Sequence, residues 1–394
     1  MKVQVVSPWY PDYASPYSGV FVQKQVEALR VAGHDVYVDV PQIFPAPPGP
    51  IPETVTSSMR ALGSRSLNSL YNTVDSVTYV PTPVPTRSGH KGRAEAMALS
   101  VGMLSELSPR DADITHAHLG LPTAWAISAH IGDRPLVVTE HQSTLASVLD
   151  EPPAARAYED VIRHSDAFIC VSEHLRGQLA SALGDWVEER VLIVPNIVDL
   201  AEIPFRSRPH PAFRSWIYVG GLVGHKGVQE LVLAFTAYKK QYDQGATLTL
   251  VGEGQLRRWI EAFAVAKGIS GSINLAGAVE HRELGRLFDD ADVMVHLSPA
   301  ETFGIAPLEA IGAGLPVVSI RNQGAFDTWG DFEARVGTLL DIGTDPSRVA
   351  DAVARLRDTG GDLDPETARR LVEERYSPNV VAEQLTAIYE RVRR

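Results

Sequence analysis

The chain has 394 residues, more than one hydrophobic core usually covers, so we expect two domains of similar size. Hydrophobic residues make up 44% of the chain and charged residues 21%, which argues against disorder of the whole chain. The formal net charge of −12 argues against nucleic acid as a partner, because phosphate backbones are bound by clustered lysines and arginines.

The sequence also argues against disulfides and membrane insertion. Cys170 is the only cysteine, so no disulfide forms within the chain, and its apolar neighbours predict a buried strand residue. No segment reaches the roughly 20 apolar residues that span a bilayer, and the amino terminus does not read as a signal peptide. We therefore expect a cytoplasmic protein without an integral membrane segment, and its oligomeric state stays open.

The first 200 residues alternate short apolar strands with helical patterns. Residues 3–6 and 35–40 are predicted strands, and the helical pattern between them ends at Gly33. A strand, a helix and a second strand in this order predict a parallel sheet. Further strands are predicted at residues 77–80, 114–117, 136–139, 167–171 and 191–194.

A proline-rich segment at residues 41–52 follows the second of these strands. Proline lacks the backbone donor and fixes φ, so we interpret the segment as a long loop and not as a helix or a central strand. Its place after a strand would put it near the rim of a ligand-binding crevice. It is therefore a candidate to contact an acceptor, whose identity the sequence does not give.

The same alternation of short apolar strands and helical patterns begins again near Trp216. Residues 194–211, between the two series, are rich in turn-forming residues and predict the interdomain link. We therefore predict an α/β fold of two Rossmann-like, doubly wound parallel-sheet domains, with residues 1–200 in the first and 201–377 in the second. Ligands bind open α/β sheets at the carboxyl ends of the strands, so we expect a site where two such sheets face each other. The strands of the second series are predicted at residues 216–219, 247–251, 273–276, 293–297 and 316–320.

The segment 299–318 is the most informative part of the sequence. It directly follows a predicted strand, and Pro307 suits the first turn of a helix. The loop before this helix would offer free backbone N–H groups and a positive helix end to an anion, and a diphosphate fits such a site. The candidate donor-binding residues of this loop are Glu301, Thr302, Phe303, Gly304 and Ile305.

Two acids of this segment are candidates for binding a sugar nucleotide. Glu309, expected in the first turn of the helix, could accept two hydrogen bonds from a ribose diol. Glu301, on the loop, could accept hydrogen bonds from the hydroxyls of a sugar. Taken singly, each acid has an ordinary explanation as well, as a charge that balances the helix dipole or as a solvated loop residue.

Glycine-rich turns follow other predicted strands. In residues 218–227 a strand leads through several glycines into a helix, and Lys226 supplies a positive charge for a phosphate. Gly19 lies in a comparable turn of the first half, and Gly252 and Glu253 lie in a turn after another strand. The further donor-binding candidates in these turns are Gly19, Gly221, Lys226, Gly252 and Glu253. Turns of this kind are common and often only structural.

Histidines follow two strands of the first half. His116 and His118 point to one face of the sheet, and no carboxylate or cysteine set at ligand spacing accompanies them, which favours polar strand ends over a metal site. His141, just beyond a strand end, is well placed to face the crevice. Two Asp-x-Asp strings, at residues 111–113 and 290–292, precede strands and so lie away from the crevice, and we reject a metal clamp there.

Together these motifs resemble the retaining GT-B glycosyltransferases of family 4, over essentially the whole chain. Glu301 and Glu309 look like the Glu-x7-Glu motif of that family, in its usual Phe-Gly and Gly-x-Pro-Val-Val surroundings. The resemblance implies that Glu301 and His141 contact the donor sugar, Glu309 the ribose and Lys226 the diphosphate. It also implies that the last helix, within residues 378–394, packs on the first domain.

The amino-terminal glycine loop of the family is matched by Ser18 and Gly19. The residues that usually bind the diphosphate in this family are not all matched. The family usually has an arginine next to its lysine, and that position here is Gly221. Lys226 and backbone amides would then carry more of the charge, and Arg321 is a candidate substitute cation.

The resemblance implies transfer of a sugar from a nucleotide diphosphate sugar, most commonly a uridine diphosphate sugar, to a hydroxyl of a small-molecule or glycan acceptor, with retention of configuration. Lys226 and the amides near Gly304 would stabilise the leaving diphosphate, so no metal ion or other cofactor is required. The catalytic candidates are His141, Glu301 and Lys226. Two alternatives stay open, a nucleotide-sugar epimerase on the same fold and a non-catalytic partner that binds sugar nucleotides.

Overall fold

The computed structural model describes residues 1–12, 17–62, 72–74, 76–107, 111–207, 212–359 and 363–393. The chain divides into two compact units, Met1–Asn196 with Val381–Arg394, and Ile197–Val380. The sequence-based boundaries fall after residue 200 and after residue 377, whereas the units meet after Asn196 and after Val380.

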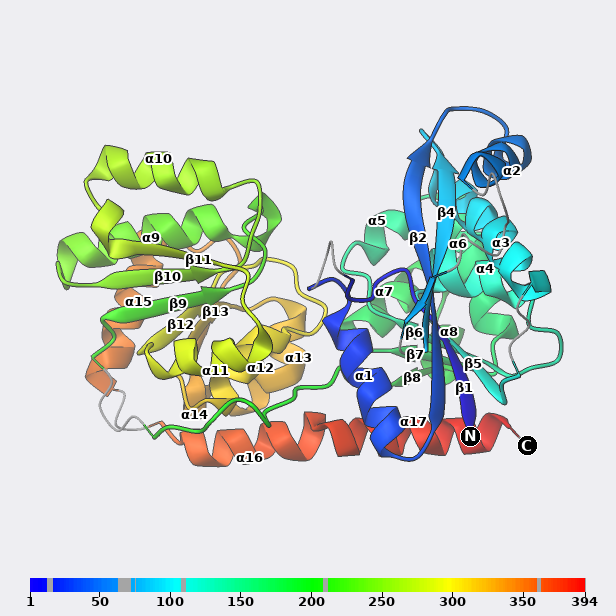
Figure 1. Ribbon diagram of the computed structural model, residues 1–394. Coiled ribbons are helices and arrows are strands. Elements are labelled where there is room, and N and C mark those ends of the chain that lie inside the picture. The colour runs from blue at the N-terminus through cyan, green and yellow to red at the C-terminus, as the bar shows by residue number, and fades with distance from the viewer. Residues whose placement is uncertain are drawn as a thin grey trace. The chain divides into compact units, whose positions relative to one another are not determined.

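The first unit contains an eight-stranded sheet in the order β3-β4-β2-β1-β5-β6-β7-β8, in which only β3 runs antiparallel to its neighbour (Figure 1). The strands are β1 (Lys2–Val6), β2 (Asp35–Ala46), β3 (Asn72–Val74), β4 (Val77–Pro85), β5 (Ile114–His118), β6 (Leu136–Glu140), β7 (Ala167–Cys170) and β8 (Val191–Ile193). The helices are α1 (Val20–Val31), α2 (Ile51–Leu62), α3 (His90–Leu107), α4 (Trp125–Ser128), α5 (Leu145–Leu149), α6 (Pro152–His164), α7 (Glu173–Leu183), α8 (Trp186–Arg190) and most of α17 (Pro378–Val392).

The interpretation of the proline-rich segment as a loop holds only for residues 47–50 and is wrong for residues 41–46, which continue β2 and pair with β4. Hydrogen bonds alternate along β2, so that Val38 bonds to the β4 side and Asp39 to the β1 side. Pro41 and Pro45 have the same parity as Asp39 and face the β1 side, but β1 pairs with β2 only as far as Asp39. The missing N–H groups therefore fall on an open edge, where proline is tolerated.

Helices cover this extended end of β2 and β4. Met59 of α2 and Ala96 of α3 pack with Val84 of β4 in a small buried cluster. Helix α2 begins at Ile51, inside the segment that the sequence analysis assigned to a loop, and Pro52 is its second residue. Proline at this place costs no helical hydrogen bond, because the first N–H groups of a helix have no intrahelical acceptor.

The second unit contains a six-stranded parallel sheet in the order β11-β10-β9-β12-β13-β14. Its strands are β9 (Ser215–Val219), β10 (Thr247–Val251), β11 (Ile273–Gly277), β12 (Val293–His296), β13 (Val317–Ile320) and β14 (Gly337–Leu340). Its helices are α9 (Val228–Gln241), α10 (Arg257–Lys267), α11 (His281–Asp289), α12 (Ile305–Gly312), α13 (Gln323–Trp329), α14 (Glu333–Val336), α15 (Pro346–Thr359) and α16 (Pro365–Tyr376). The sequence analysis missed β14, which is short and has only two apolar residues, and it also missed β3.

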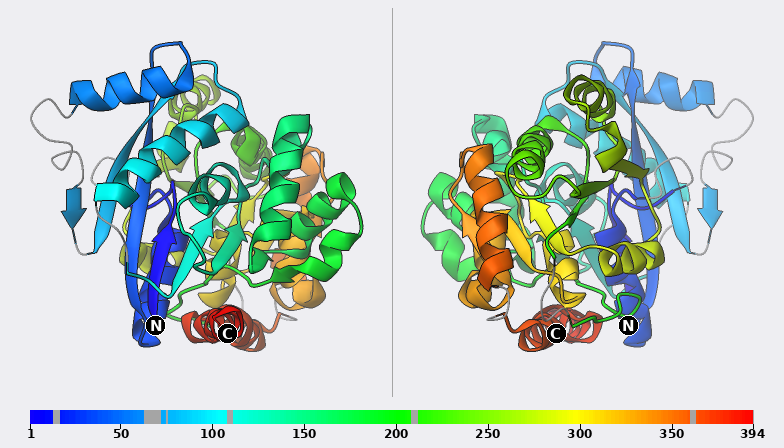
Figure 2. Two further views of the ribbon diagram at one scale, coloured as in Figure 1. Left: turned by 90° about the vertical axis from the view of Figure 1, so that its right-hand side faces the viewer. Right: turned by 90° about the vertical axis from the view of Figure 1, so that its left-hand side faces the viewer.

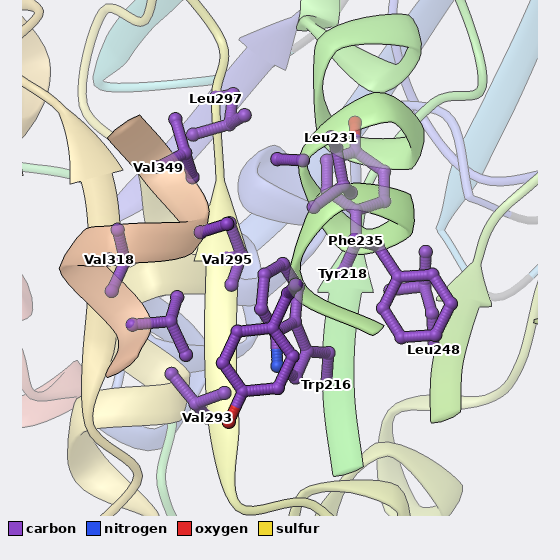
Figure 3. Close-up of a cluster of buried hydrophobic side chains, with 14 of the residues drawn as sticks. Trp216, Tyr218, Leu231, Phe235, Leu248, Val293, Val295, Leu297, Val318 and Val349 are labelled. Carbon is purple, nitrogen blue, oxygen red and sulfur yellow. The ribbon is translucent and has the colours of Figure 1, made fainter. Parts of the chain in front are cut away.

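Helices lie on both faces of this second sheet, with α9 and α10 on one side and α11 and α12 on the other (Figures 1 and 2). The core under α9 is built around aromatic side chains, of which Trp216 and Tyr218 come from β9 and Phe235 from α9 (Figure 3). Leu231 of α9 and Val349 of α15 belong to the same cluster, and both side chains are fully buried. No helix in the described part of the chain is long and apolar enough to cross a bilayer.

In each sheet the strand order reverses beside the first strand of the unit. β1 lies between β2 and β5, and β9 lies between β10 and β12. The connections on the two sides of such a point pass over opposite faces of the sheet, which leaves a crevice at the carboxyl ends of the strands. The loops after β1 and β5 and the loops after β9 and β12 are therefore the places where each unit can bind a ligand.

Candidate functional site

The turns after β9 and β10 lie backbone against backbone. Leu222 N donates to Glu253 O at 2.9 Å, and a Cβ atom on Gly252 would lie 2.0 Å from Gly220 O. Only glycine at position 252 permits this close approach. The packing brings Gly221 and Glu253, two of the sequence-predicted donor-binding residues, together at the carboxyl edge of the sheet, with Glu253 O 4.0 Å from a Cβ atom built on Gly221.

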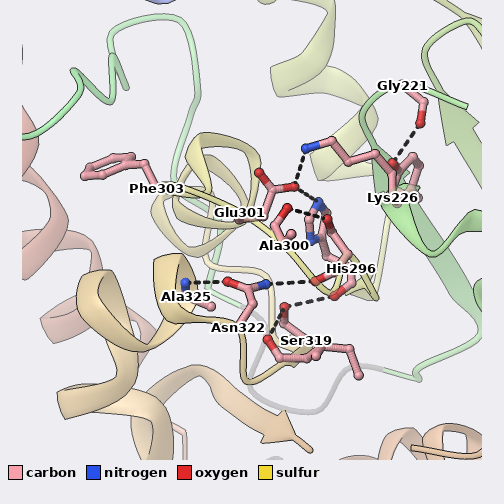
Figure 4. Close-up of polar contacts among 12 residues, drawn as sticks. Gly221, Lys226, His296, Ala300, Glu301, Phe303, Ser319, Asn322 and Ala325 are labelled. Atoms are coloured by element: carbon pink, nitrogen blue, oxygen red, sulfur yellow. Dashed lines mark hydrogen bonds and ion pairs between the residues drawn. The ribbon is translucent and has the colours of Figure 1, made fainter. Parts of the chain in front are cut away.

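A second glycine brings Lys226 to the loop after β12. Gly227 begins α9 with φ of 67°, and a Cβ atom there would lie 2.1 Å from the carbonyl oxygen of Leu297. The start of α9 can therefore approach the end of β12 only without a side chain at this position. Lys226 Nζ lies 2.7 Å from Glu301 Oε1, so the predicted diphosphate lysine and sugar-binding acid form an ion pair (Figure 4).

Glu301 is a largely buried acid, with 15% of its side chain exposed. His296 Nε2 lies 3.6 Å from the same carboxylate oxygen, and the His296 ring stacks on Tyr218 at 5.6 Å. Burial raises the pKa of Glu301, but His296 and Lys226 together outweigh burial and hold that pKa below its ordinary value. Because burial lowers the pKa of His296 itself, we assign the neutralising charge to Lys226.

The loop that carries Glu301 is braced by the loop after β13. Asn322 Nδ2 donates to Ser298 O and its Oδ1 accepts from Ala325 N, both at 2.9 Å (Figure 4). Gly324 N donates to Glu301 O at 3.2 Å, and a Cβ atom on Gly324 would lie 2.6 Å from that oxygen. The fold itself thus fixes the position of the acid, which reduces the entropy cost of binding a ligand.

The start of α12 is open in the way that the sequence analysis expected of an anion site. Gly304 precedes the helix with φ of 86°, and the N–H groups of Ile305 and Ala306 have no intrahelical acceptor, while Pro307 has no N–H. Phe303 points away from Glu301 and packs edge to face on Tyr376 at 5.2 Å (Figure 4). Its side chain therefore anchors the loop in the protein, while the half-buried Thr302 lies between this anchor and Glu301.

Glu309 lies in the second turn of α12 and not in the first, because Gly304 lets the helix begin at Ile305. Its side chain is almost fully buried, and Oε1 lies 2.9 Å from Nε2 of His281, the first residue of α11. The other ring nitrogen of His281 lies 3.5 Å from Glu202 Oε2. His281, which the sequence analysis did not single out, thus holds the predicted ribose-binding carboxylate in place.

The structure does not support Arg321 as a substitute for the missing arginine. Its guanidinium donates to Glu333 Oε2 at 2.7 Å and lies 5.7 Å from the centre of the Phe326 ring. At Gly221 there is room for a side chain, since the nearest atom to a built Cβ is Val223 Cγ2 at 3.7 Å. The glycine is therefore not required by packing at this position.

In the first unit, Gly19 and His141 are brought near each other by α1. Gly19 begins this helix with φ of 69°, and a Cβ atom there would lie 2.3 Å from the backbone carbonyl of Trp9. Two residues later, the Phe21 ring lies 4.7 Å from the ring of His141. The glycine loop after β1 and the histidine after β6 therefore belong to one local site.

Glu140, which the sequence analysis missed as a functional residue, fixes the backbone at His141. One carboxylate oxygen accepts from His141 N at 2.9 Å and from Gln142 N at 2.7 Å. The other accepts from Gly120 N at 2.9 Å and from the Tyr158 hydroxyl at 2.7 Å. Burial raises the pKa of Glu140, and these four hydrogen bonds offset part of that rise. An acid that ends an apolar strand directly before His141 was the available signal.

The remaining histidines and the Asp-x-Asp strings have structural partners. His116 and His118 stack at 4.7 Å on one face of the sheet, as predicted. Asp292 accepts from Ser215 N at 2.9 Å at the amino end of β9, and Asp111 pairs with Lys2 at the amino end of β1. Within the described residues, no three acidic, histidine or cysteine side chains are arranged to hold a metal ion.

Comparison with known protein families assigns both halves of the chain. Residues 18–202 match the model described as Glycosyltransferase Family 4, and residues 202–377 match the model described as Glycosyl transferases group 1. The chain belongs to the GT-B glycosyltransferases of family 4. The fold class expected from the sequence is confirmed by two parallel-sheet α/β units and by structural neighbours of the same type.

Relatives of this glycosyltransferase cover most of its length. It is 28% identical over 390 residues to a glycogen synthase of Mycobacterium tuberculosis, and the matched region covers 94% of this chain and 88% of the relative. A sucrose-phosphate synthase of Thermosynechococcus elongatus superposes with a TM-score of 0.73 over 99% of this chain and 98% of that one, at 16% identity. The Anabaena protein HepE, solved with UDP and glucose, gives a TM-score of 0.67 over 99% and 100% of the two chains, at 17% identity.

The close approach of α9 to β12 predicts that Gly227→Ala destabilises the second unit far more than Gly268→Ala. Both glycines have φ of 67°, so both substitutions cost about 1 kcal/mol of backbone strain. Only the Cβ atom at position 227 also meets a backbone carbonyl, which adds about 2 kcal/mol, since nothing lies within 4 Å of the Cβ atom at position 268. Urea denaturation of the two variants measures the difference, and equal losses would contradict the packing described here.

Proposed function

We propose that this glycosyltransferase moves a sugar from a nucleotide diphosphate sugar to an acceptor hydroxyl, with retention of anomeric configuration and without a metal ion. The observation that carries the proposal is the ion pair of Lys226 and Glu301 beside the open start of α12. A cation for a leaving diphosphate and an acid for sugar hydroxyls stand next to each other at the point where the strand order reverses.

Bond cleavage at the anomeric carbon places negative charge on the leaving diphosphate. Lys226 and the backbone N–H groups of Ile305 and Ala306 can stabilise this charge, which lowers the barrier. Glu301 is held ionised, so it can accept hydrogen bonds from the hydroxyls of the donor sugar. When a diphosphate binds, it competes with Glu301 for Lys226, and the lysine then bridges phosphate and carboxylate.

Glu309 and His281 support a nucleoside as the other part of the donor. The Glu309 carboxylate is nearly buried and held by His281 through one oxygen, which leaves its second oxygen to accept from a ribose diol. Uridine is the base we favour, because UDP is bound by the similar HepE structure. For the acceptor we propose a small molecule or a glycan. His141 in the first unit, with Glu301 and Lys226, completes the catalytic set that we propose.

The binding of the diphosphate is tested by titrating metal-free protein, in excess EDTA, with uridine, guanosine, adenosine and thymidine diphosphates. We expect one diphosphate to raise the melting temperature selectively, because a ligand of the native state stabilises it. Lys226→Met should weaken that binding at least about tenfold, the effect of losing a charged hydrogen bond. Lys240→Met is the matched control, because Lys240 is an exposed lysine of α9.

Two outcomes of this titration would contradict the proposal. Equal weakening in both lysine variants would show that Lys226 acts only through overall charge. Absence of binding by all four diphosphates would favour a protein that does not bind sugar nucleotides in this unit. Product analysis with a sugar nucleotide and no acceptor separates transfer from the alternative of an epimerase, which would convert the donor sugar and release no diphosphate.

The space at Gly221 predicts a gain of affinity. Gly221→Arg restores the cation that is usual in the family, and its Cβ atom meets only ordinary contacts. We expect the dissociation constant for the bound diphosphate to fall about tenfold, because a guanidinium adds a charged, bidentate donor. Gly221→Gln, of similar length and without charge, is the control, and isothermal titration calorimetry gives both constants. Equal affinities of the arginine and glutamine variants would place the diphosphate elsewhere.

A further inference from the structure

We propose that Glu202 is a positioning residue for the nucleotide of the donor and acts through His281 on Glu309. The proposal rests on the proposed function in one respect, that Glu309 accepts hydrogen bonds from a ribose. Glu202 lies in the turn-rich segment that the sequence analysis interpreted only as the interdomain link, and it belongs to the second unit. The nucleotide site then includes a residue to which no sequence motif points.

The three side chains form a row of acid, imidazole and acid. His281 Nε2 lies 2.9 Å from Glu309 Oε1, and Nδ1 of the same ring lies 3.5 Å from Glu202 Oε2. The exposed fraction of the side chain rises along the row, from 10% at Glu309 through 19% at His281 to 53% at Glu202. The imidazole therefore connects the nearly buried acid of α12 to an acid at the surface of the same unit.

Close packing holds the segment that carries Glu202 against the two helices that carry its partners. A Cβ atom on Gly285 of α11 would lie 2.6 Å from the carbonyl oxygen of Glu202 and 3.0 Å from the ring of Pro204. At the end of α12, a Cβ atom on Gly312 would lie 2.5 Å from the side chain of Leu200. Because only glycine permits these approaches, the backbone at Glu202 has a fixed place beside both helices.

A single guanidinium ties the same segment to α12. Nη1 of Arg369, in α16, donates to the carbonyl oxygens of Ile203 and Gly312 at 3.0 and 2.8 Å. The residue after Glu202 is thus joined to the last residue of the helix that carries Glu309. The folded backbone already places Glu202 where it meets the imidazole, which reduces the entropy cost of this contact.

An imidazole with a carboxylate beside each nitrogen has a preferred charge and a preferred orientation. An ionised carboxylate can only accept hydrogen bonds, so each ring nitrogen that faces one is favoured with its proton. Two nearby negative charges also favour the doubly protonated, positively charged ring. Glu202 thus strengthens the charge that His281 presents to Glu309. It also opposes a rotation of the ring that would turn a C–H group toward Glu309.

The orientation of His281 matters for a ribose because it fixes the carboxylate of Glu309. With Oε1 held by the imidazole, the second oxygen keeps one place from which it can accept from ribose hydroxyls. If the ring turned away, the ligand would have to order the carboxylate itself, at a cost in affinity. Loss of the charge of Glu202 should therefore weaken only those ligands that carry ribose hydroxyls.

Glu202→Gln removes this charge and keeps the size of the side chain. Isothermal titration calorimetry compares uridine diphosphate with its 2′,3′-dideoxy analogue, which has no ribose hydroxyls. Relative to a control variant, we expect Glu202→Gln to weaken uridine diphosphate about threefold, as for a half-exposed ion pair, and to leave the analogue unchanged. Glu280→Gln is the control, because Glu280 precedes His281 in the chain, is exposed and pairs with Arg282 at 2.7 Å.

A double-mutant cycle tests whether Glu202 acts through the imidazole. In His281→Gln the amide nitrogen can take the place of Nε2 and donate to Glu309, but the ring nitrogen that faces Glu202 is lost. We expect Glu202→Gln to have no further effect on the affinity for uridine diphosphate in the His281→Gln protein, because residues that act as one unit are not additive. Additive losses would overturn the proposal.

A second measurement uses no ligand. Nitrogen-15 spectra of histidine-labelled protein at pH 7 report how much of the His281 ring is doubly protonated. We expect a larger share in the wild type and in Glu280→Gln than in Glu202→Gln. Equal spectra of wild type and Glu202→Gln would overturn the proposal, and so would equal loss of affinity for both ligands. Failure of the proposed function shows separately, as a wild-type protein that does not bind uridine diphosphate, and the spectra still decide whether Glu202 acts on His281.

Discussion

The site of the second unit depends on an anion that burial alone would not permit. A carboxylate as enclosed as that of Glu301 would take up a proton unless a cation lay beside it, and Lys226 is that cation. The pair exists because Gly227 lets the start of α9 touch the end of β12. The bracing of the loop after β12 then keeps the carboxylate in place. The proposed sugar contact of Glu301 thus depends on the charge of Lys226, and the place of Lys226 depends on the backbone packing at Gly227.

In the first unit the buried candidate side chains are uncharged histidines, in contrast to the ionised Glu301. The rings of His116, His118 and His141 form a buried stack, and burial lowers the pKa of each, so that all three are neutral. Glu140 fixes the backbone of His141, while His118 fixes its ring. The candidate residues of the two units therefore differ in charge: an ionised acid with its cation in one, and a buried, neutral imidazole in the other.

The sequence predicted the fold well, since buried parallel strands are short apolar runs between turns. It failed where a local rule depends on a neighbour: Pro41 and Pro45 are strand residues because β1 ends early, which no local pattern reveals. The acids and glycines of the second unit were visible as motifs. The partners of Glu309 and His141 were not, because His281 and His118 approach them only through the tertiary fold, from 28 and 23 residues away in the chain.

The most direct measurement is a crystal structure of the protein grown with uridine diphosphate in the presence of EDTA. We expect the diphosphate within hydrogen-bond distance of Lys226 Nζ and of the N–H groups that follow Gly304. We also expect the ribose hydroxyls on the second oxygen of Glu309, the one not held by His281, and no metal between the phosphates. A nucleotide bound away from these groups, or an unbroken pair of Lys226 and Glu301 with the diphosphate elsewhere, would contradict this expectation.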